Sequence, residues 1–169
     1  TTTVASSAIR YPNHTNSNAN FLSVLNNQIE LCAVTPLERW DRMEWYSSTS
    51  GGKIYVPFGY WLPDLWTFQP SALSMTTAES LYVDPQGRKL LEVTWEAVHN
   101  THFSSDKELK TKTGVYVGCM YTDYQQMLSQ TQMGSNAQAG TGSGYSFLCG
   151  RVSYVLGFRG PCMALDTAC

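Results

Sequence analysis

The 169-residue sequence has few charged residues, no long apolar run and no paired cysteine motif, and each absence excludes a class of protein. Only 14% of the residues are charged and the formal net charge is −2, so no basic surface for nucleic acid is expected. This low charge also suggests that much of the surface is covered by something else. No apolar run approaches the roughly eighteen residues of a membrane span, so no transmembrane segment is expected.

The N-terminus and the cysteines exclude two further classes. The opening residues, TTTVASSAIRYP, lack the basic segment and apolar core of a signal peptide, so none is expected. The cysteines form no CxxC or CxxxH pair, so no zinc or other metal site is expected. Their odd number favours reduced thiols in a reducing compartment, either the cytoplasm or an organellar stroma or matrix. The five cysteines are Cys32, Cys119, Cys149, Cys162 and Cys169.

The residues that are present indicate globular material. Hydrophobic residues make up 43% of the chain and aromatic residues 12%, which is typical of a protein with a packed core. The length allows one domain, and we expect that domain to span residues 1–169.

The last twenty residues, GRVSYVLGFRGPCMALDTAC, predict a helix, a turn and a strand. Val152, Val155 and Leu156 fall on one helical face with Tyr154 beside them, and residues 157–161 (GFRGP) stop the helix. Residues 162–168 form an apolar run that is typical of a strand covered on both faces. Cys169 follows directly.

A cysteine at the end of a buried strand is a candidate nucleophile. In a strand–turn–helix elbow the side chain is exposed, and the N–H groups that begin the next helix lower the thiol pKa. The alternative interpretation is that Cys169 is an ordinary buried thiol.

The remaining pattern predicts alternating strands and helices. We expect strands over residues 2–12 and 114–119, and helices over 21–27, 85–99 and 125–132. Phe21, Leu22 and Leu25 would form the apolar face of the first helix. In the second helix, Asp84 is the expected cap and Pro85 the first residue, and Leu91, Trp95 and Val98 line one face.

Three connecting segments complete the pattern. Trp40, Trp45 and Tyr46 are expected to cluster, and residues 104–113 (SSDKELKTKT) to form a charged connection. Residues 136–144 (NAQAGTGSG) look like a phosphate-binding loop. They lack the lysine and the strand-to-helix context, so we expect a loop without a nucleotide.

Several segments together resemble the β-ketoacyl synthase (ketosynthase) domains of modular polyketide synthases and fatty acid synthases. Those domains carry GRxSYxLGLxGP, then a strand, then DTAC. The matching residues are Gly150, Arg151, Ser153, Tyr154, Leu156, Gly157, Gly160, Pro161, Asp166, Thr167, Ala168 and Cys169. Residues 36–41 (PLERWD), 83–97 (VDPQGRKLLEVTWEA) and 113–118 (TGVYVG) resemble further family motifs. Ser6, Ser7, Gln69 and Gly87 depart from the family pattern.

The resemblance implies a fold and an activity. The fold class would be α/β, the N-terminal part of a thiolase-like fold with α/β/α/β/α layers. Cys169 would be the catalytic nucleophile that accepts an acyl group in decarboxylative Claisen condensation. Its substrates would be acyl thioesters carried on phosphopantetheine, with no cofactor bound directly. The partners would be an acyl carrier protein and the rest of a homodimeric ketosynthase. His14, His99 and His102 lie outside the family's histidine motifs, HGTGT and KxxxGH, and no catalytic role is expected for them.

The resemblance also leaves three interpretations of the chain. It corresponds to the first part of the first thiolase-like half. It could be a portion of a complete ketosynthase, half of a split enzyme, or a non-catalytic, ketosynthase-derived structural component of a larger protein assembly, in contact with its other subunits. Alone, a chain ending at Cys169 is expected to be inactive in condensation.

Overall fold

The computed structural model describes residues 2–49, 51–101, 107–144, 146–166 and 168. The chain divides into two compact units. The first comprises Thr1–Ser7 with Leu65–Cys169, and the second comprises Ala8–Asp64. Among the described residues, no helix is long and apolar enough to cross a membrane.

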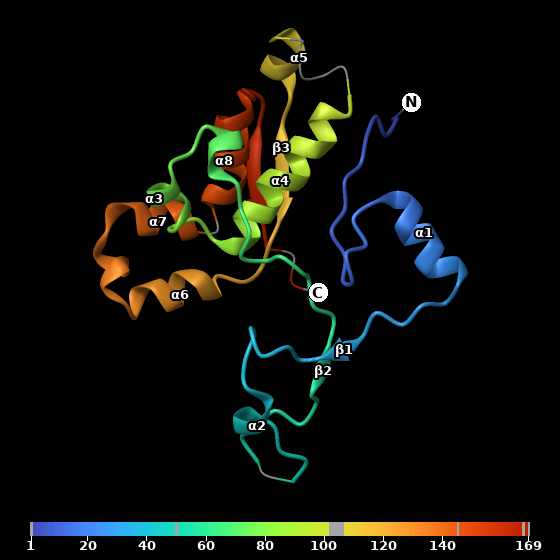
Figure 1. Cartoon of the computed structure of the whole chain (residues 1–169). Coiled ribbons are helices and arrows are strands. Elements are labelled where there is room, and N and C mark those ends of the chain that lie inside the picture. The colour runs from blue at the N-terminus through green and yellow to red at the C-terminus, as the bar shows by residue number, and fades with distance from the viewer. Residues whose placement is uncertain (1, 50, 102–106, 145, 167, 169) are drawn as a thin grey trace. The chain divides into compact units, whose positions relative to one another are not determined.

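The second unit holds two short helices and a small antiparallel pair of strands (Figure 1). Helix α1 spans Asn18–Asn26, and the Ser17 side chain caps it by accepting a hydrogen bond from the Asn20 amide. Strand β1 (Ala33–Val34) pairs antiparallel with β2 (Phe58–Gly59), and helix α2 spans Arg42–Trp45.

Two predictions for the N-terminal residues are wrong, and one is confirmed. Residues 2–12 form no strand, and the only ladder contact described there is the bridge between Tyr11 and Thr15. Helix α1 confirms the predicted helix, and on its apolar face Phe21 stacks on Tyr11 while Leu22 and Leu25 are each 56% exposed. Trp40 packs edge-on against Trp61, with ring centroids 5.0 Å apart, whereas Trp45 of the expected cluster is about half exposed.

The first unit contains the remaining elements in the order η1 (Pro70–Leu73), α3 (Thr77–Ser80), α4 (Pro85–His99), α5 (Lys107–Lys112), β3 (Val115–Gly118), α6 (Asp123–Ser129), η3 (Gln132–Ser135), α7 (Ala137–Ser143), α8 (Phe147–Leu156) and β4 (Cys162–Leu165). Helix α5 occupies part of the predicted charged connection. Residues 104–106 of that connection lie outside the described residues.

Helix α4 forms as its sequence predicts. Asp84 caps it by accepting a hydrogen bond from the Gln86 amide at 2.7 Å, and Pro85 is the first residue. Leu91 is 1% exposed, and Trp95 and Val98 pack against the core from the same face. The two ends of this helix therefore have fixed positions relative to the core.

Strands β3 and β4 are parallel, with Val115 opposite Cys162 and Gly118 opposite Leu165. Helices α4 and α8 lie on one face of the pair (Figure 1), and the core lies between them. Apart from Leu91, its buried members include Val83, Val115, Val117, Leu148, Cys149, Val152 and Phe158.

Two glycines shape the turn that joins α8 to β4. Gly157 ends the helix in the left-handed region with φ of 73°, which glycine adopts without strain. The Gly160 amide donates to the Thr113 carbonyl at 3.0 Å, and a Cβ at Gly160 would lie 2.5 Å from that oxygen. Only glycine allows this approach, which places the start of β4 beside the start of β3.

The composition of residues 136–144 predicts a loop, and this prediction is wrong. Most of the segment forms the helix α7. Asn136 caps this helix by accepting from the Gln138 amide at 2.9 Å. Buried Gly142 lies against the backbone of Tyr82, where a Cβ would come within 2.7 Å of the Tyr82 carbonyl carbon. Gly142 therefore permits close packing of this helix.

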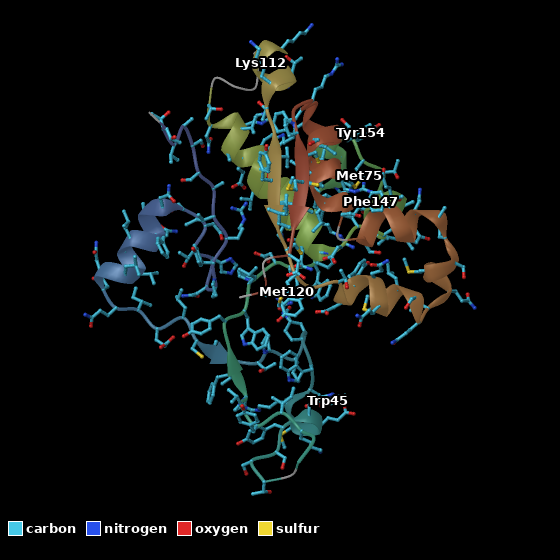
Figure 2. All side chains as sticks on the ribbon, turned by 180° about the vertical axis from the view of Figure 1, so that it is seen from behind. Trp45, Met75, Lys112, Met120, Phe147 and Tyr154 are labelled. Atoms are coloured by element: carbon cyan, nitrogen blue, oxygen red, sulfur yellow. The ribbon has the colours of Figure 1, made fainter. Side chains whose placement is uncertain are left out.

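Strand β4 is covered on one face, not on both as predicted. Met163 and Leu165 are 48% and 44% exposed, whereas Ala164 packs against the core. Helices α4 and α8 both lie on the Ala164 face, and none of the described elements covers the other. Tyr154, expected beside the buried face of α8, is 88% exposed (Figure 2).

Candidate active site

The carboxyl ends of β3 and β4 lie at one edge because the strands are parallel. Cys119 directly follows β3, and its amide donates to the Leu165 carbonyl of β4 at 3.0 Å. Asp166 directly follows β4. In α/β proteins ligands bind outside the carboxyl ends of parallel strands, so this edge is where a reactive group is expected.

The N-terminus of α4 meets the same edge through the side chain of Gln86. Its Nε2 donates to the Tyr121 carbonyl at 3.1 Å, and its Oε1 lies 3.4 Å from the Cys119 sulfur. We call Asp84, Gln86, Cys119, Tyr121 and Asp166 the carboxyl-edge cluster. Gln86 therefore ties the helix to the segment that follows β3.

Asp84 carries a perturbed carboxyl group in this cluster. Its side chain is buried, and burial raises the carboxyl pKa above the ordinary range because ionisation in an apolar surrounding is unfavourable. Hydrogen bonds from Gln86 and the charge of Arg88 oppose the rise, whereas the nearby Asp123 carboxylate adds to it. The edge therefore disfavours additional negative charge.

The same surroundings keep Cys119 in its thiol form. Burial raises the pKa of the Cys119 thiol first, and the negative charges of Asp84 and Asp166 raise it further. The backbone N–H groups of Tyr121 and Met120 oppose this rise. Because the thiolate is the nucleophilic form, Cys119 is suited to donate a hydrogen bond to Gln86 and not to attack a substrate.

After β4 the structure describes Asp166 and Ala168. Asp166 Oδ1 accepts a hydrogen bond from the Ala168 amide at 2.9 Å, and Ala168 has φ of 51°, in the left-handed region. A non-glycine residue rarely adopts that region, so the backbone at Ala168 is strained. The predicted nucleophile, Cys169, and its neighbour Thr167 lie outside the described residues.

Helix α8, which precedes β4, is anchored by Arg151. The guanidinium donates to Glu79 Oε1 at 2.8 Å and to the Thr141 carbonyl at 3.3 Å. Arg88 similarly holds the start of α4, since its Nε donates to the Val83 carbonyl at 2.9 Å. These contacts fix the two helices that pack against the parallel strands.

Within the first unit, the described histidine His99 lies away from this edge. His99 is the last residue of the 15-residue α4, so about 20 Å of helix separates it from Asp84. Its ring stacks on Trp95, with centroids 3.8 Å apart. His14 contacts Asp64 at 3.5 Å in the second unit, and His102 lies outside the described residues. No group of three or more metal-ligating side chains occurs among the described residues.

Sequence reasoning assigned no role to Gln86 or Cys119. Both carry a signal that could have found them. Gln86 is at the second position of a capped helix, and Cys119 directly follows an apolar strand. The two side chains meet because the start of α4 and the residue after β3 lie at the same edge.

Comparison with known proteins gives a consistent result. A family model described as "Beta-ketoacyl synthase, N-terminal domain" matches residues 3–169. A phenolphthiocerol/phthiocerol polyketide synthase of Mycobacterium tuberculosis is 34% identical over 162 residues, which is 95% of this chain and 10% of that protein. A mycocerosic acid synthase-like polyketide synthase of Mycolicibacterium smegmatis is 32% identical over 164 residues, 96% of this chain and 8% of that protein. The chain thus spans about a tenth of these relatives.

Solved structures give the same fold. An oxazolomycin ketosynthase domain of Streptomyces albus JA3453 has a TM-score of 0.82 and 32% identity, covering 97% of this chain and 28% of that one. A ketosynthase from module 6 of the bacillaene synthase of Bacillus subtilis 168 has a TM-score of 0.79 and 23% identity, covering 97% and 26%. The predicted α/β class, the N-terminal part of a thiolase-like fold, is confirmed.

Proposed function

We propose an acyl-accepting role for this chain, which belongs to the β-ketoacyl synthase N-terminal domain family. In this proposal Cys169 is the nucleophile of a ketosynthase site. The observation that carries it is the parallel pairing of β3 with β4, because β4 ends beside Asp166 at the carboxyl edge. The sequence DTAC therefore begins where an α/β protein presents its reactive groups.

The proposed reaction is a transfer of an acyl group between two sulfur atoms. The Cys169 thiolate attacks the carbonyl carbon of an acyl thioester on the phosphopantetheine arm of a carrier protein. A carbon–sulfur bond forms at Cys169, the bond to the pantetheine sulfur breaks, and the released thiolate takes up a proton. Hydrogen-bond donors at the carbonyl oxygen would stabilise the intermediate.

The second stage of condensation is decarboxylation of a malonyl thioester and attack of the resulting carbanion on the bound acyl group. We assign the acid–base groups of this stage to residues outside this chain. The support is that His99 lies at the far end of α4 from the carboxyl-edge cluster and that its ring is stacked on Trp95.

One experiment tests the role of Cys169. The natural protein is first weighed by intact-mass spectrometry, which distinguishes a species near 18.8 kDa from a longer chain that includes this one. It is then incubated with an acyl-pantetheine thioester and digested. Acylation at Cys169 that disappears in Cys169→Ala and persists in Cys119→Ser supports the proposal. Equal acylation of Cys119, Cys149 and Cys169 would overturn it.

A structural role within a larger assembly is the second candidate function. It is supported by the apolar face of the β3–β4 pair, where Tyr116, Met163 and Leu165 are 64%, 48% and 44% exposed. Apolar surface of this kind is typical of a protein interface. Under this proposal the protein would elute with other subunits in size-exclusion chromatography, and Cys169 would react no faster than Cys119 with iodoacetamide. Selective acylation of Cys169 would exclude it.

A further inference from the structure

The register of the parallel strands places Cys162 on the same face of the sheet as the buried valines of β3. Cys162 is the first residue of β4 and lies opposite Val115, and Ala164 lies opposite Val117. Val115 and Val117 are buried in the core, at 9% and 8% exposure. Because side chains alternate along a strand, Cys162 points to the same face as these valines.

Helix α8 covers that face and carries another cysteine. Cys149 is 4% exposed, and Val152, about one turn later, is 1% exposed, so both lie on the buried side of the helix. Burial raises the pKa of the Cys149 thiol, and a hydrogen bond with Cys162 and the charge of its thiolate raise it further. The two sulfur atoms therefore face each other across the contact between α8 and β4.

The two thiols differ in their access to solvent. Cys162 is exposed at the start of β4, whereas Cys149 is buried. A small oxidant in solution can reach Cys162, and among the described cysteines Cys149 interacts with it and can resolve the oxidised sulfur. This is the arrangement of an attacking and a resolving cysteine.

We propose that Cys149 and Cys162 are a site of oxidative modification, at which a peroxide forms a disulfide that joins α8 to the first residue of β4. Both cysteines are free in the structure, which is the reduced form of this pair. The proposal concerns thiols other than the predicted nucleophile, and it does not depend on acyl transfer.

The reaction balances with hydrogen peroxide as the named oxidant. The Cys162 thiolate attacks one peroxide oxygen, the oxygen–oxygen bond breaks, and sulfenic acid and one water result. The Cys149 sulfur then attacks the Cys162 sulfur, a sulfur–sulfur bond forms, and the sulfenic oxygen leaves as a second water. Two electrons pass from the two sulfurs to the peroxide, and the two thiol protons are taken up in the waters.

The other described cysteines are placed differently. Cys119 follows the opposite end of β3 from the residue that faces Cys162, as the labelled Lys112 and Met120 at the two ends of that strand show (Figure 2). Its sulfur contacts Gln86 and the Tyr121 carbonyl. Cys32 belongs to the second unit. They serve as matched controls.

The test is peptide mapping of the full chain after titration with hydrogen peroxide. Free thiols are blocked with iodoacetamide, and the protein is digested without reductant. Trypsin is unsuitable because it leaves Cys119 with Cys149 in one peptide and Cys162 with Cys169 in another. Chymotrypsin cuts after Phe147 or Leu148, after Tyr154 or Phe158 and after Leu165, so it separates all four cysteines.

The expected product is lighter than the starting chain by two hydrogen atoms and contains a cross-link between the Cys149 and Cys162 peptides that reductant removes. Cys32→Ser and Cys119→Ser should form the same cross-link, and Cys162→Ser should leave Cys149 alkylated. Sulfenic or sulfinic acid at Cys162 without a cross-link would overturn the proposal, and so would a cross-link from Cys162 to any other cysteine. The wild-type map alone decides, so an unfolded variant does not obscure the result. Acylation at Cys169 is a separate readout, so this proposal and the proposed function can fail independently.

Discussion

Helix α7 offers a pair of glycine-to-alanine substitutions with opposite expected effects. At Gly140 a Cβ would meet no atom within 4 Å, whereas at Gly142 it would lie 2.7 Å from the Tyr82 carbonyl carbon. Both positions lie inside the same helix, so the gain in helix propensity is shared. The difference between the variants therefore measures the close contact alone.

The magnitudes follow from the two surroundings. Gly140→Ala should stabilise the protein by about 0.5–1 kcal/mol, the usual difference between glycine and alanine in a helix. Gly142→Ala gains the same amount but forces α7 away from backbone atoms that cannot rotate aside, which costs about 1–3 kcal/mol or more. The shift also weakens the hydrogen bond from the Asp84 amide to the Gly142 carbonyl, 3.1 Å long. We expect Gly142→Ala to be destabilised by about 2 kcal/mol.

Urea unfolding followed by far-ultraviolet circular dichroism measures both variants, because the longest helices, α4 and α8, lie in the same unit as α7. Hydrogen exchange of the α4 amides gives a second readout near the contact. Wild-type stability in Gly142→Ala, or equal effects of the two substitutions, would refute the role assigned to this glycine.

Three further predictions concern charged and titratable groups. Glu79→Gln should destabilise the protein by about 1 kcal/mol, because the ion pair with Arg151 is short and the Arg151 side chain is only 16% exposed. A double-mutant cycle with Arg151→Met should give a coupling free energy of similar size. The absence of coupling would contradict the anchoring role of Arg151. Burial raises the pKa of Asp84 in the folded state, so its stabilising contribution is complete below the ordinary aspartate pKa and is lost as the pH rises through the raised value. Asp84→Asn keeps an oxygen that caps α4 and removes the charge. Its free energy of unfolding should therefore fall less than that of the wild type between about pH 3 and pH 8. If urea unfolding gave the same pH dependence for both proteins, this prediction would be contradicted. The same substitution should lower the pKa of the Cys119 thiol by removing a negative charge, and so raise its iodoacetamide alkylation rate. An unchanged rate would show that Asp84 does not act on this thiol.

The elements that could be predicted from sequence are those whose local signals agree with their packing. Asp84 followed by Pro85 begins α4, and Gly157 ends α8, because caps and positive φ depend on a few neighbouring residues. Val115 and Val117 predict β3 through the same apolar character that buries them. In these segments the local preference and the tertiary contact require the same residues.

The predictions fail where only a tertiary contact decides the structure. The glycines of residues 136–144 are typical of a loop, yet Gly142 is small because Tyr82 approaches it, and no local pattern reveals that neighbour. Residues 2–12 have strand character but form no ladder, since pairing depends on a partner strand. In the candidate site, Gln86 and Cys119 meet through a tertiary contact between the start of α4 and the residue after β3, which no local pattern specifies. The role of Cys169 stays a prediction.

The pairing of β3 with β4 also determines how this unit can fold. The paired residues 115–118 and 162–165 are separated by α6, η3, α7 and α8, so the strands meet only after that whole segment is synthesised and compacted. Non-local pairing of this kind slows folding, because the entropy of closing the loop is lost before the contacts form. Until β4 docks, Val115 and Val117 lie on a strand that lacks this neighbour. The helices between the strands, fastened by Arg151, shorten the search by holding the start of β4 near its partner.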